Sequence, residues 1–179
     1  MPTSVNKLRQ VFSFTALCIL FLPISITAQT GSAFSHLRPE HASVVRQWLG
    51  KRPDLRLATE ADCTNKDGLA ATRNERGRNY HPYYAIGDFN GDGKQDFAVA
   101  LIKKRPSKWR FAIAIFNGPL RNDSAPAYFG DSADLSSGGF FVGSSGKRKV
   151  LVAGIFESDD CVVLKPRRKT YVVKDCLDE

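Results

Sequence analysis

The chain has 179 residues, of which 26 are Lys or Arg and 18 are Asp or Glu, so its formal net charge is +8. This length gives one domain enough residues for a real hydrophobic core and leaves no room for several full-sized domains. The positive balance favours anionic partners over cationic ones.

Residues 1–28 have the pattern of a secretory signal peptide. The opening MPTSVNKLRQ carries Lys7 and Arg9 and no acid, the apolar run VFSFTALCILFL is too short to span a bilayer comfortably, and PISITA ends at Ala28. This order predicts cleavage after Ala28 and export to the periplasm or the extracellular space. Because Ile26 is bulkier than the usual residue three positions before a cut, an uncleaved amino-terminal anchor is the alternative.

The mature chain keeps all 18 acidic residues, and 24 basic residues remain once Lys7 and Arg9 are removed, so its net charge is +6. Residues 29–36 are small and polar, which predicts a flexible leader. Residues 37–179 are predicted to form a single globular domain, and no second apolar segment is long enough for a membrane span.

One helix and a series of strands are expected along this domain. Apolar residues recur at helical spacing from Leu37 to Leu49, and Gly50 is a typical helix end. The segment DLRLAT alternates like a short strand, whereas 62–81 is polar and rich in turn residues and is expected as a long loop. The segments DFAVALI and WRFAIAIF are apolar on both faces, which predicts an antiparallel pair in the middle of a covered sheet.

The rest of the chain is expected to add β structure. The segment 118–146 is rich in loop-forming residues, 149–158 is expected as a strand, and 161–176 as a final hairpin. The predicted class is therefore α+β, with one N-terminal helix followed by a mostly antiparallel sheet of about five or six strands.

The segment AIGDFNGDGKQDFAVALI contains a candidate cation site. Asp88, Asn90 and Asp92 place side-chain oxygens at every second position, Lys94 offers its main-chain carbonyl, and Asp96 closes the loop as the strand begins. Gly91 and Gly93 allow backbone conformations that are closed to other residues. Three carboxylates this close repel one another, and a divalent cation converts the repulsion into attraction.

Calcium is the predicted ion. A flexible loop made only of oxygen donors suits calcium better than magnesium, which keeps its waters, and the loop has no Cys or His for zinc or copper. An EF-hand is not indicated, because the twelfth position counted from Asp88 is Val99 and not a glutamate. The alternative is a plain turn of solvated acids, since Asp-Gly and Asn-Gly pairs are common between strands.

The stretch GDFNGDGKQDFAVAL resembles the calcium loop of FG-GAP/VCBS-type repeats, the blades of integrin-alpha-like propellers. The resemblance covers residues 83–102. It implies side-chain binding of calcium at Asp88, Asn90, Asp92 and Asp96 and main-chain binding at Lys94. Because the loop occurs once and the chain is too short for a full β-propeller, the resemblance implies a single calcium-loop hairpin inside a small domain.

Three cysteines remain after cleavage, and export permits disulfides. Cys161 and Cys176 flank the last predicted hairpin and are expected to pair if its turn lies near Arg168 and Lys169. A bond from Cys63 to either of them, or three reduced thiols, are the alternatives.

Basic residues gather in three connectors. They are Lys103, Lys104, Arg105, Lys108 and Arg110, then Lys147, Arg148 and Lys149, then Lys165, Arg167, Arg168 and Lys169. If the connectors share one end of the sheet, they form a patch for an anionic cell-surface polymer or protein. The alternative is that the charges keep hairpin tips soluble. No aromatic stripe or RNA-binding motif accompanies them, so a nucleic-acid partner is not expected.

Signs of catalysis are few. His36, His41 and His81 are scattered, and His41 falls on the apolar stripe of the predicted helix, where a packed histidine is expected. A thiol nucleophile at Cys63 with His81 as its base rests on residue type alone. The sequence therefore predicts an exported, non-catalytic binding protein with a structural calcium loop; a secreted basic adhesin or inhibitor, or a small hydrolase, are the alternatives.

Overall fold

Two central strands, β3 (Asp96–Lys103) and β4 (Phe111–Phe116), organise the fold. Every residue of both strands except Lys103 is buried, so apolar side chains fill both faces of the pair, as expected from the sequence. The structure, a computed structural model, describes residues 33–105, 107–131, 134–146 and 148–176. The predicted signal peptide and the first residues of the leader lie outside these ranges. Within them, no helix combines the length and apolar character that crossing a bilayer requires.

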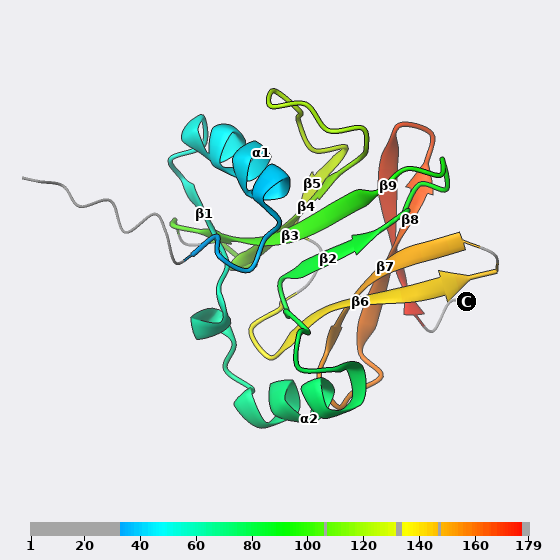
Figure 1. The fold of residues 1–179 in the computed structure, drawn as a ribbon. Helices are drawn as coiled ribbons and strands as arrows, with labels where there is room; N and C mark the ends of the chain where they lie inside the picture. Colours follow the sequence, from blue (N-terminus) through cyan, green and yellow to red (C-terminus); the bar gives the residue numbers. More distant parts are fainter. Residues whose placement is uncertain (1–32, 106, 132–133, 147, 177–179) are drawn as a thin grey trace, which may run out of the picture.

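The other elements surround this pair (Figure 1). In chain order they are α1 (Pro39–Gly50), β1 (Leu55–Leu57), the short 3-10 helix η1 (Glu60–Asp62), α2 (Lys66–Arg76), β2 (Tyr84–Gly87), β5 (Tyr128–Gly130), β6 (Gly138–Ser145), β7 (Arg148–Ile155), β8 (Cys161–Arg167) and β9 (Thr170–Asp175).

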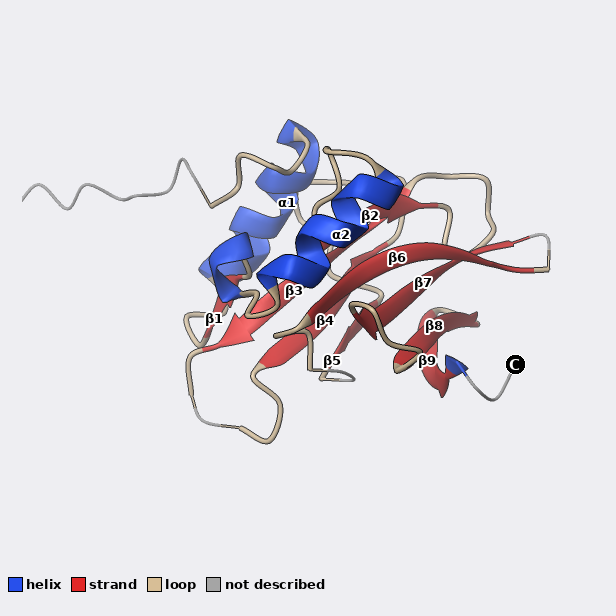
Figure 2. Ribbon diagram, turned by 90° about the horizontal axis from the view of Figure 1, so that it is seen from below, coloured by secondary structure: helices blue, strands red, loops and turns tan. Residues whose placement is uncertain are grey.

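The strands form two antiparallel sheets. The five-stranded sheet has the order β1-β3-β4-β5, and β2 pairs with β3 as well. The four-stranded sheet is a meander in the order β6-β7-β8-β9. The two sheets meet where β2 lies beside β6 (Figures 1 and 2). This arrangement confirms the α+β class, and it contains neither a closed barrel nor a propeller.

Two hydrophobic clusters hold the layers together. One face of β3 and β4 packs against α1, with Val45 and Phe97 fully buried. The other face packs against the four-stranded sheet, where Ile113 and Leu151 are fully buried, and α2 contributes Leu69. The central sheet is therefore covered on both sides.

Three predictions from the sequence need correction. The segment 62–81 is not only a loop, because it contains α2, which begins after the N-cap Asn65. The segment 118–146 contains β5 and β6, and β2 precedes the acidic loop, so the described residues form nine strands where five or six were expected. Residues 33–36 are not a loose leader, since Phe34 packs on the α1 core and carries the Arg46 guanidinium over its ring at 4.7 Å.

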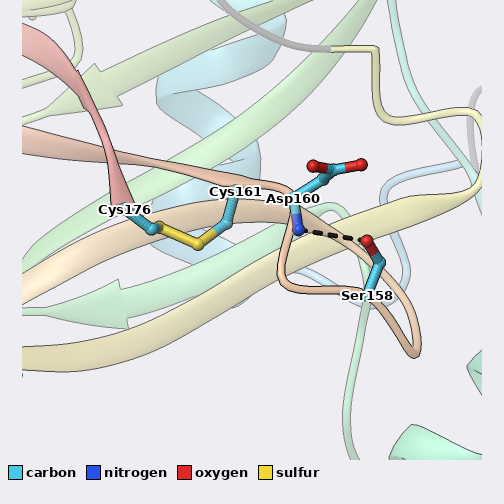
Figure 3. The surroundings of a disulfide bond; sticks show 4 residues. All are labelled: Ser158, Asp160, Cys161 and Cys176. Carbon is cyan, nitrogen blue, oxygen red and sulfur yellow. Dashed lines mark hydrogen bonds between the residues drawn. A yellow bond between two sulfur atoms is a disulfide. The ribbon is translucent and has the colours of Figure 1, made fainter. Parts of the chain in front are cut away.

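A disulfide closes the last hairpin. Val162 pairs with Asp175 across β8 and β9, which sets Cys161 opposite Cys176, and the two form a bond with Cα atoms 5.5 Å apart (Figure 3). In the preceding turn the Asp160 amide donates to Ser158 Oγ at 3.0 Å. Cys63 is free and buried. The structure thus contains the expected Cys161–Cys176 bond.

Replacing both Cys161 and Cys176 by serine is expected to lower the free energy of unfolding. The closed loop spans 15 residues, and restriction of the unfolded chain by a loop of this size contributes about 3 kcal/mol in the chain-entropy model. Urea unfolding measures the loss. Cys63→Ala is the control, since it leaves the cross-link intact; a non-reduced peptide map that joined Cys63 to another cysteine would contradict the assignment.

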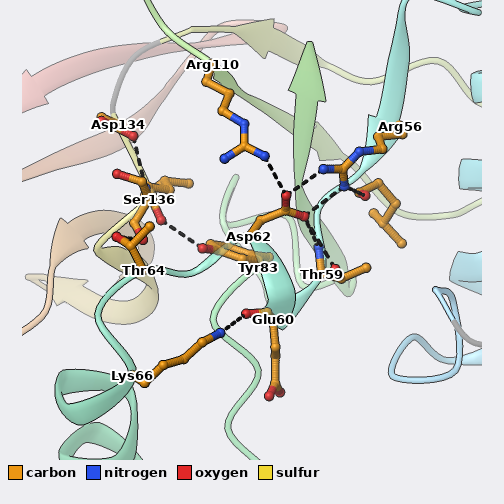
Figure 4. Close-up of polar contacts among 12 residues, drawn as sticks. Arg56, Thr59, Glu60, Asp62, Thr64, Lys66, Tyr83, Arg110, Asp134 and Ser136 are labelled. Carbon is orange, nitrogen blue, oxygen red and sulfur yellow. Dashed lines mark hydrogen bonds and ion pairs between the residues drawn. The ribbon is translucent and has the colours of Figure 1, made fainter. Parts of the chain in front are cut away.

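A buried carboxylate ties β1 to the start of β4 (Figure 4). Asp62 accepts hydrogen bonds from Arg56 at 2.8 and 2.5 Å, from Arg110 at 2.9 Å and from the Thr59 amide at 3.0 Å. Burial by itself would raise the pKa of Asp62, but these hydrogen bonds and the charges of the two arginines hold that pKa below its usual value. The network fixes the chain where it leaves β1.

Asp62→Asn is expected to lower the free energy of unfolding by about 1–3 kcal/mol. The charged hydrogen bonds are lost, and Arg56 keeps only one acceptor oxygen where the carboxylate offered it two. The folded pKa is depressed, so the contribution of Asp62 is fully present above its unfolded pKa of about 3.9 and disappears as pH falls through the folded value. Urea midpoints at pH 7 and at pH 2.5 or below test this. Asp54→Asn, which weakens only the exposed 3.6 Å pair with Arg52, should change stability little at either pH.

Candidate cation site in the loop between β2 and β3

The buried Asp96 carboxylate holds the predicted cation loop in place through main-chain hydrogen bonds. Its Oδ2 accepts the amides of Phe89 at 2.8 Å and Asn90 at 3.2 Å, and its Oδ1 accepts the amide of Gly118 at 2.9 Å. Asp96 is the first residue of β3 and is fully buried. It therefore joins the loop, the start of β3 and the segment after β4 through main-chain donors.

The loop itself wraps around Asp88. Oδ1 of this carboxylate accepts the amides of Gly91 at 2.8 Å and Asp92 at 3.1 Å, and Oδ2 accepts the amide of Gly93 at 2.9 Å. The wrapping requires positive φ at Gly91 (76°) and Gly93 (80°), which only glycine adopts without strain. The reason given for these glycines from the sequence is confirmed.

The three remaining predicted ligands are partly or fully exposed on this loop. Asn90 Oδ1 accepts the Asp92 amide at 2.9 Å, and Asp92 Oδ1 accepts the Lys94 amide at 2.9 Å. The Asn90 side-chain amide donates to Asp92 Oδ2 at 3.2 Å. Because a carboxylate or amide oxygen has two lone pairs, Asp88, Asn90 and Asp92 each keep acceptor capacity for a further partner.

The negative charge of the loop has no basic partner of its own. Within the described residues, no ion pair reaches Asp88, Asp92 or Asp96. Burial raises the pKa of Asp96 in spite of its three amide donors, and the charge of Asp92 raises it further. Burial also raises the pKa of nearby Tyr171, with added contributions from the charges of Asp96, Asp92 and Asp88. The loop is thus a local concentration of negative charge without a direct ion pair among the described residues.

The donor set agrees with calcium in kind. Carboxylate, amide and main-chain carbonyl oxygens are the ligands that calcium takes. Among the described residues, however, no three His, Cys, Asp or Glu side chains lie in an arrangement that could hold a metal ion. Asp96 is buried, and its carboxylate is turned to main-chain amides. Asp96 is an observed anchor of the loop, and its role as a ligand stays a prediction.

Comparisons with known proteins do not assign the chain to a family. The chain matches no family model, and neither curated proteins nor solved structures give a significant match. The resemblance of residues 83–102 to FG-GAP/VCBS-type loops therefore rests on the loop sequence itself.

The three basic connectors do not share one end of the molecule. Lys103 ends β3 and Asp96 begins it, which separates the first connector from the acidic loop by about 23 Å along the strand. Arg148 of the second connector lies at the loop, since a Cβ added to Gly91 would be 3.3 Å from its Nε. Figure 1 also places the β8–β9 turn on the side of the acidic loop, opposite the β3–β4 connector. A single basic patch is not formed; Lys147 lies outside the described residues.

The histidines fall into two places. His41 is 2% exposed, stacks on Phe97 with ring centroids 4.1 Å apart and contacts Tyr84 Oη through Nδ1 at 2.6 Å, so its expected role as a packed core residue is confirmed. His36 and His81, which are 45 positions apart in sequence, come within 5.3 Å between ring centroids. Proximity of this kind carries no signal in the sequence.

His36 and His81 line a cavity of about 420 Å³ together with Glu60, whose Oε1 lies 3.7 Å from His81 Nδ1. Burial lowers the pKa of His36, and the charge of His81 lowers it further. Cys63 does not join them: it is 2% exposed within the core, and its Sγ donates to the Asn65 carbonyl at 3.4 Å. The contacts described therefore do not support a pairing of Cys63 as nucleophile with His81 as base.

Gly93→Ala is expected to destabilise the protein by about 1–2 kcal/mol, because alanine is forced into the left-handed region. A Cβ at this position meets no atom within 4 Å, so backbone strain is the sole cost. Gly50→Ala is the matched control: that glycine lies in α1, also in open space, and alanine there should raise stability. Urea midpoints of the two variants should move in opposite directions; equal shifts would contradict the loop conformation.

Proposed function

We propose that this chain is an exported calcium-binding domain. In it, the loop 88–96 holds one structural ion through Asp88, Asn90, Asp92 and the carbonyl of Lys94, and the Asp96 carboxylate lies on the buried side of the ion. The observation that carries the proposal is the loop itself: three carboxylates lie within nine residues, and no basic side chain in the described part of the chain pairs with any of them.

The conformation of the loop supports the same proposal. Three main-chain amides hold Asp88, and two glycines with positive φ carry the chain around it. Little chain entropy then remains to be lost when a cation binds, because the donors are already ordered. Asn90 and Asp92 keep acceptor capacity for the ion. Asp88 and Asp96 each accept three amides and keep one lone pair, and Asp96 is the buried one of the two.

The ion would supply charge neutralisation and rigidity. It would lie between β2 and β3, the strands that the loop connects, and would offset the burial and the nearby Asp92 charge, which both raise the pKa of Asp96. Extracellular calcium reaches concentrations that fill even weak sites, with Kd of about 10⁻⁴–10⁻³ M. Loading would therefore accompany export, and the domain would act as a rigid, non-catalytic binding module of the envelope or extracellular space.

Calcium is expected to stabilise the domain, by about 2.7 kcal/mol when its concentration exceeds the Kd a hundredfold. Isothermal titration and thermal melting of residues 29–179, each with calcium and with EGTA, measure binding and stabilisation. Magnesium should give a smaller response, because it dehydrates reluctantly.

Asp92→Asn is expected to abolish most of this response, since it removes a loop charge whose carboxylate is exposed and whose loss should leave the fold intact. Asp123→Asn is the matched control, because Asp123 is also an exposed acid, and among the described residues its ion pair is with Arg121, at 3.6 Å. Melting that ignores EGTA, together with no heat on addition of calcium to the native domain, would sink the proposal.

A further inference from the structure

Two strand edges face each other at the junction of the sheets. β2 pairs with β3 along one edge and β6 pairs with β7 along one edge, so each keeps a second edge without a strand partner. The facing edges are joined only at their start, where the Phe140 amide donates to the Pro82 carbonyl at 2.7 Å and Tyr80 Oη donates to the Phe140 carbonyl at 3.0 Å. Beyond these bonds the two strands run in the same direction and diverge (Figure 1).

The register identifies the main-chain groups on the free edge of β2. The Ala100 amide donates to the Tyr83 carbonyl at 3.0 Å. In an antiparallel ladder, hydrogen-bonded positions alternate with positions whose groups point away. Ala85 and Gly87 therefore face β3, whereas Tyr84 and Ile86 direct their main-chain groups outward.

The same reasoning applies to β6. The Phe156 amide donates to the Ser137 carbonyl at 3.1 Å, so Phe141 and Gly143 face β7. Val142 and Ser144 direct their amides and carbonyls outward. Outside the strand ladders, no main-chain hydrogen bond in the described part of the chain involves Ile86, Val142 or Ser144, and the register turns their groups away from β3 and β7.

A groove of about 360 Å³ lies between these edges. Tyr84 and Ile86 line one wall, and Phe141 and Val142 line the other. Val142 is 37% exposed, one of two large apolar side chains with such exposure in the described chain. At the joined end the Arg76 guanidinium lies 4.7 Å above the Phe141 ring, and no carboxylate of the described residues pairs with it.

We propose that this groove binds an extended, acidic segment of a partner protein, which adds as a strand along β6 with β2 as the facing wall. Unpaired amides and carbonyls at alternate positions recognise an extended backbone, and the apolar walls accept every second side chain. Arg76 provides the countercharge for an acidic residue at the joined end.

Charge complementarity favours such a partner over a second copy of this chain. Edge-to-edge pairing of two copies would place positive charge against positive charge, because each copy carries the unpaired Arg76 and the predicted mature chain has a net charge of +6. An acidic strand meets attraction in place of that repulsion.

The probe is a short capped peptide in which valine and threonine alternate, with a single glutamate at one end to pair with Arg76, added to isotope-labelled domain. Binding is expected to be saturable and to slow hydrogen exchange at the amides of Ile86, Val142 and Ser144. The same peptide N-methylated throughout keeps its side chains and charge but lacks donors, and it should bind at least about tenfold more weakly. Arg76→Gln should weaken binding of the unmodified peptide several-fold.

A protein variant tests the ladder directly. Val142→Pro removes an amide that points outward and leaves the bonds of Phe141 and Gly143 to β7, a position where edge strands tolerate proline. It should reduce peptide affinity about tenfold, whereas Val142→Thr, which keeps the amide, should not. If Val142→Pro fails to fold, the N-methylated peptide on the unaltered domain makes the same distinction.

Four results would overturn the proposal: no binding, equal binding of the N-methylated peptide, protection of amides elsewhere, or a dimer of the domain alone in which these amides are already protected. The last result would assign the edge to a second copy. All four results are read in EGTA, without calcium, so failure of this proposal can be distinguished from failure of the proposed cation site.

Discussion

The loop end of this molecule depends on one buried carboxylate that has no basic partner in the described structure. Asp96 takes amides from both ends of the central hairpin, from Phe89 and Asn90 before β3 and from Gly118 after β4. Burial of a charge is costly unless hydrogen bonds or an opposite charge compensate it. Here the amides supply hydrogen bonds without charge, and the pKa of Asp96 remains raised. The fold thus keeps the buried Asp96 carboxylate in place at an electrostatic cost. A cation bound in the loop would reduce that cost.

The sequence predicted the elements whose pattern is strong. β3 and β4 are continuous apolar runs, and α1 has its apolar stripe at helical spacing. α2 was missed because it buries little: among its eleven residues only Gly68, Leu69 and Thr72 are buried. Its Asn65 cap, whose side chain accepts the Gly68 amide at 2.9 Å, was a usable signal within a polar stretch.

β6 was missed for a different reason. Its sequence GGFFVGSS has the composition of a loop, but its glycines are required by close contacts with other segments. A Cβ on Gly138 would lie 2.0 Å from the Gly154 carbonyl oxygen, and one on Gly139 would lie 2.6 Å from Tyr80 Oη. Glycine in a strand often marks such an approach, but the partners come from distant parts of the chain and cannot be read from the local sequence. The meeting of His36 with His81 escaped prediction for the same reason.

The residues of the candidate site could be picked out from the sequence because the predicted ligands lie within nine consecutive residues. What could not be predicted is the division of labour among them: Asp88 organises the loop, Asn90 and Asp92 lie on its more exposed part, and Asp96 reaches down to Gly118, twenty-two positions away. Gly118 itself has a structural role, since a Cβ there would lie 2.6 Å from the Gln95 carbonyl oxygen. A single spacing pattern assigned the same role to residues that the tertiary structure separates.

Both proposed binding features converge on β2. This strand has four residues, is hydrogen-bonded to β3 along one edge, and ends at Gly87, directly before Asp88 and opposite Asp96 in the ladder. Short strands held on one side are among the less stable parts of a fold. A cation in the loop would fix the end of β2, and a strand in the groove would fix its free edge. Because each would reduce the same conformational freedom, binding at one site would lower the entropic cost of binding at the other, with no change in the average structure required.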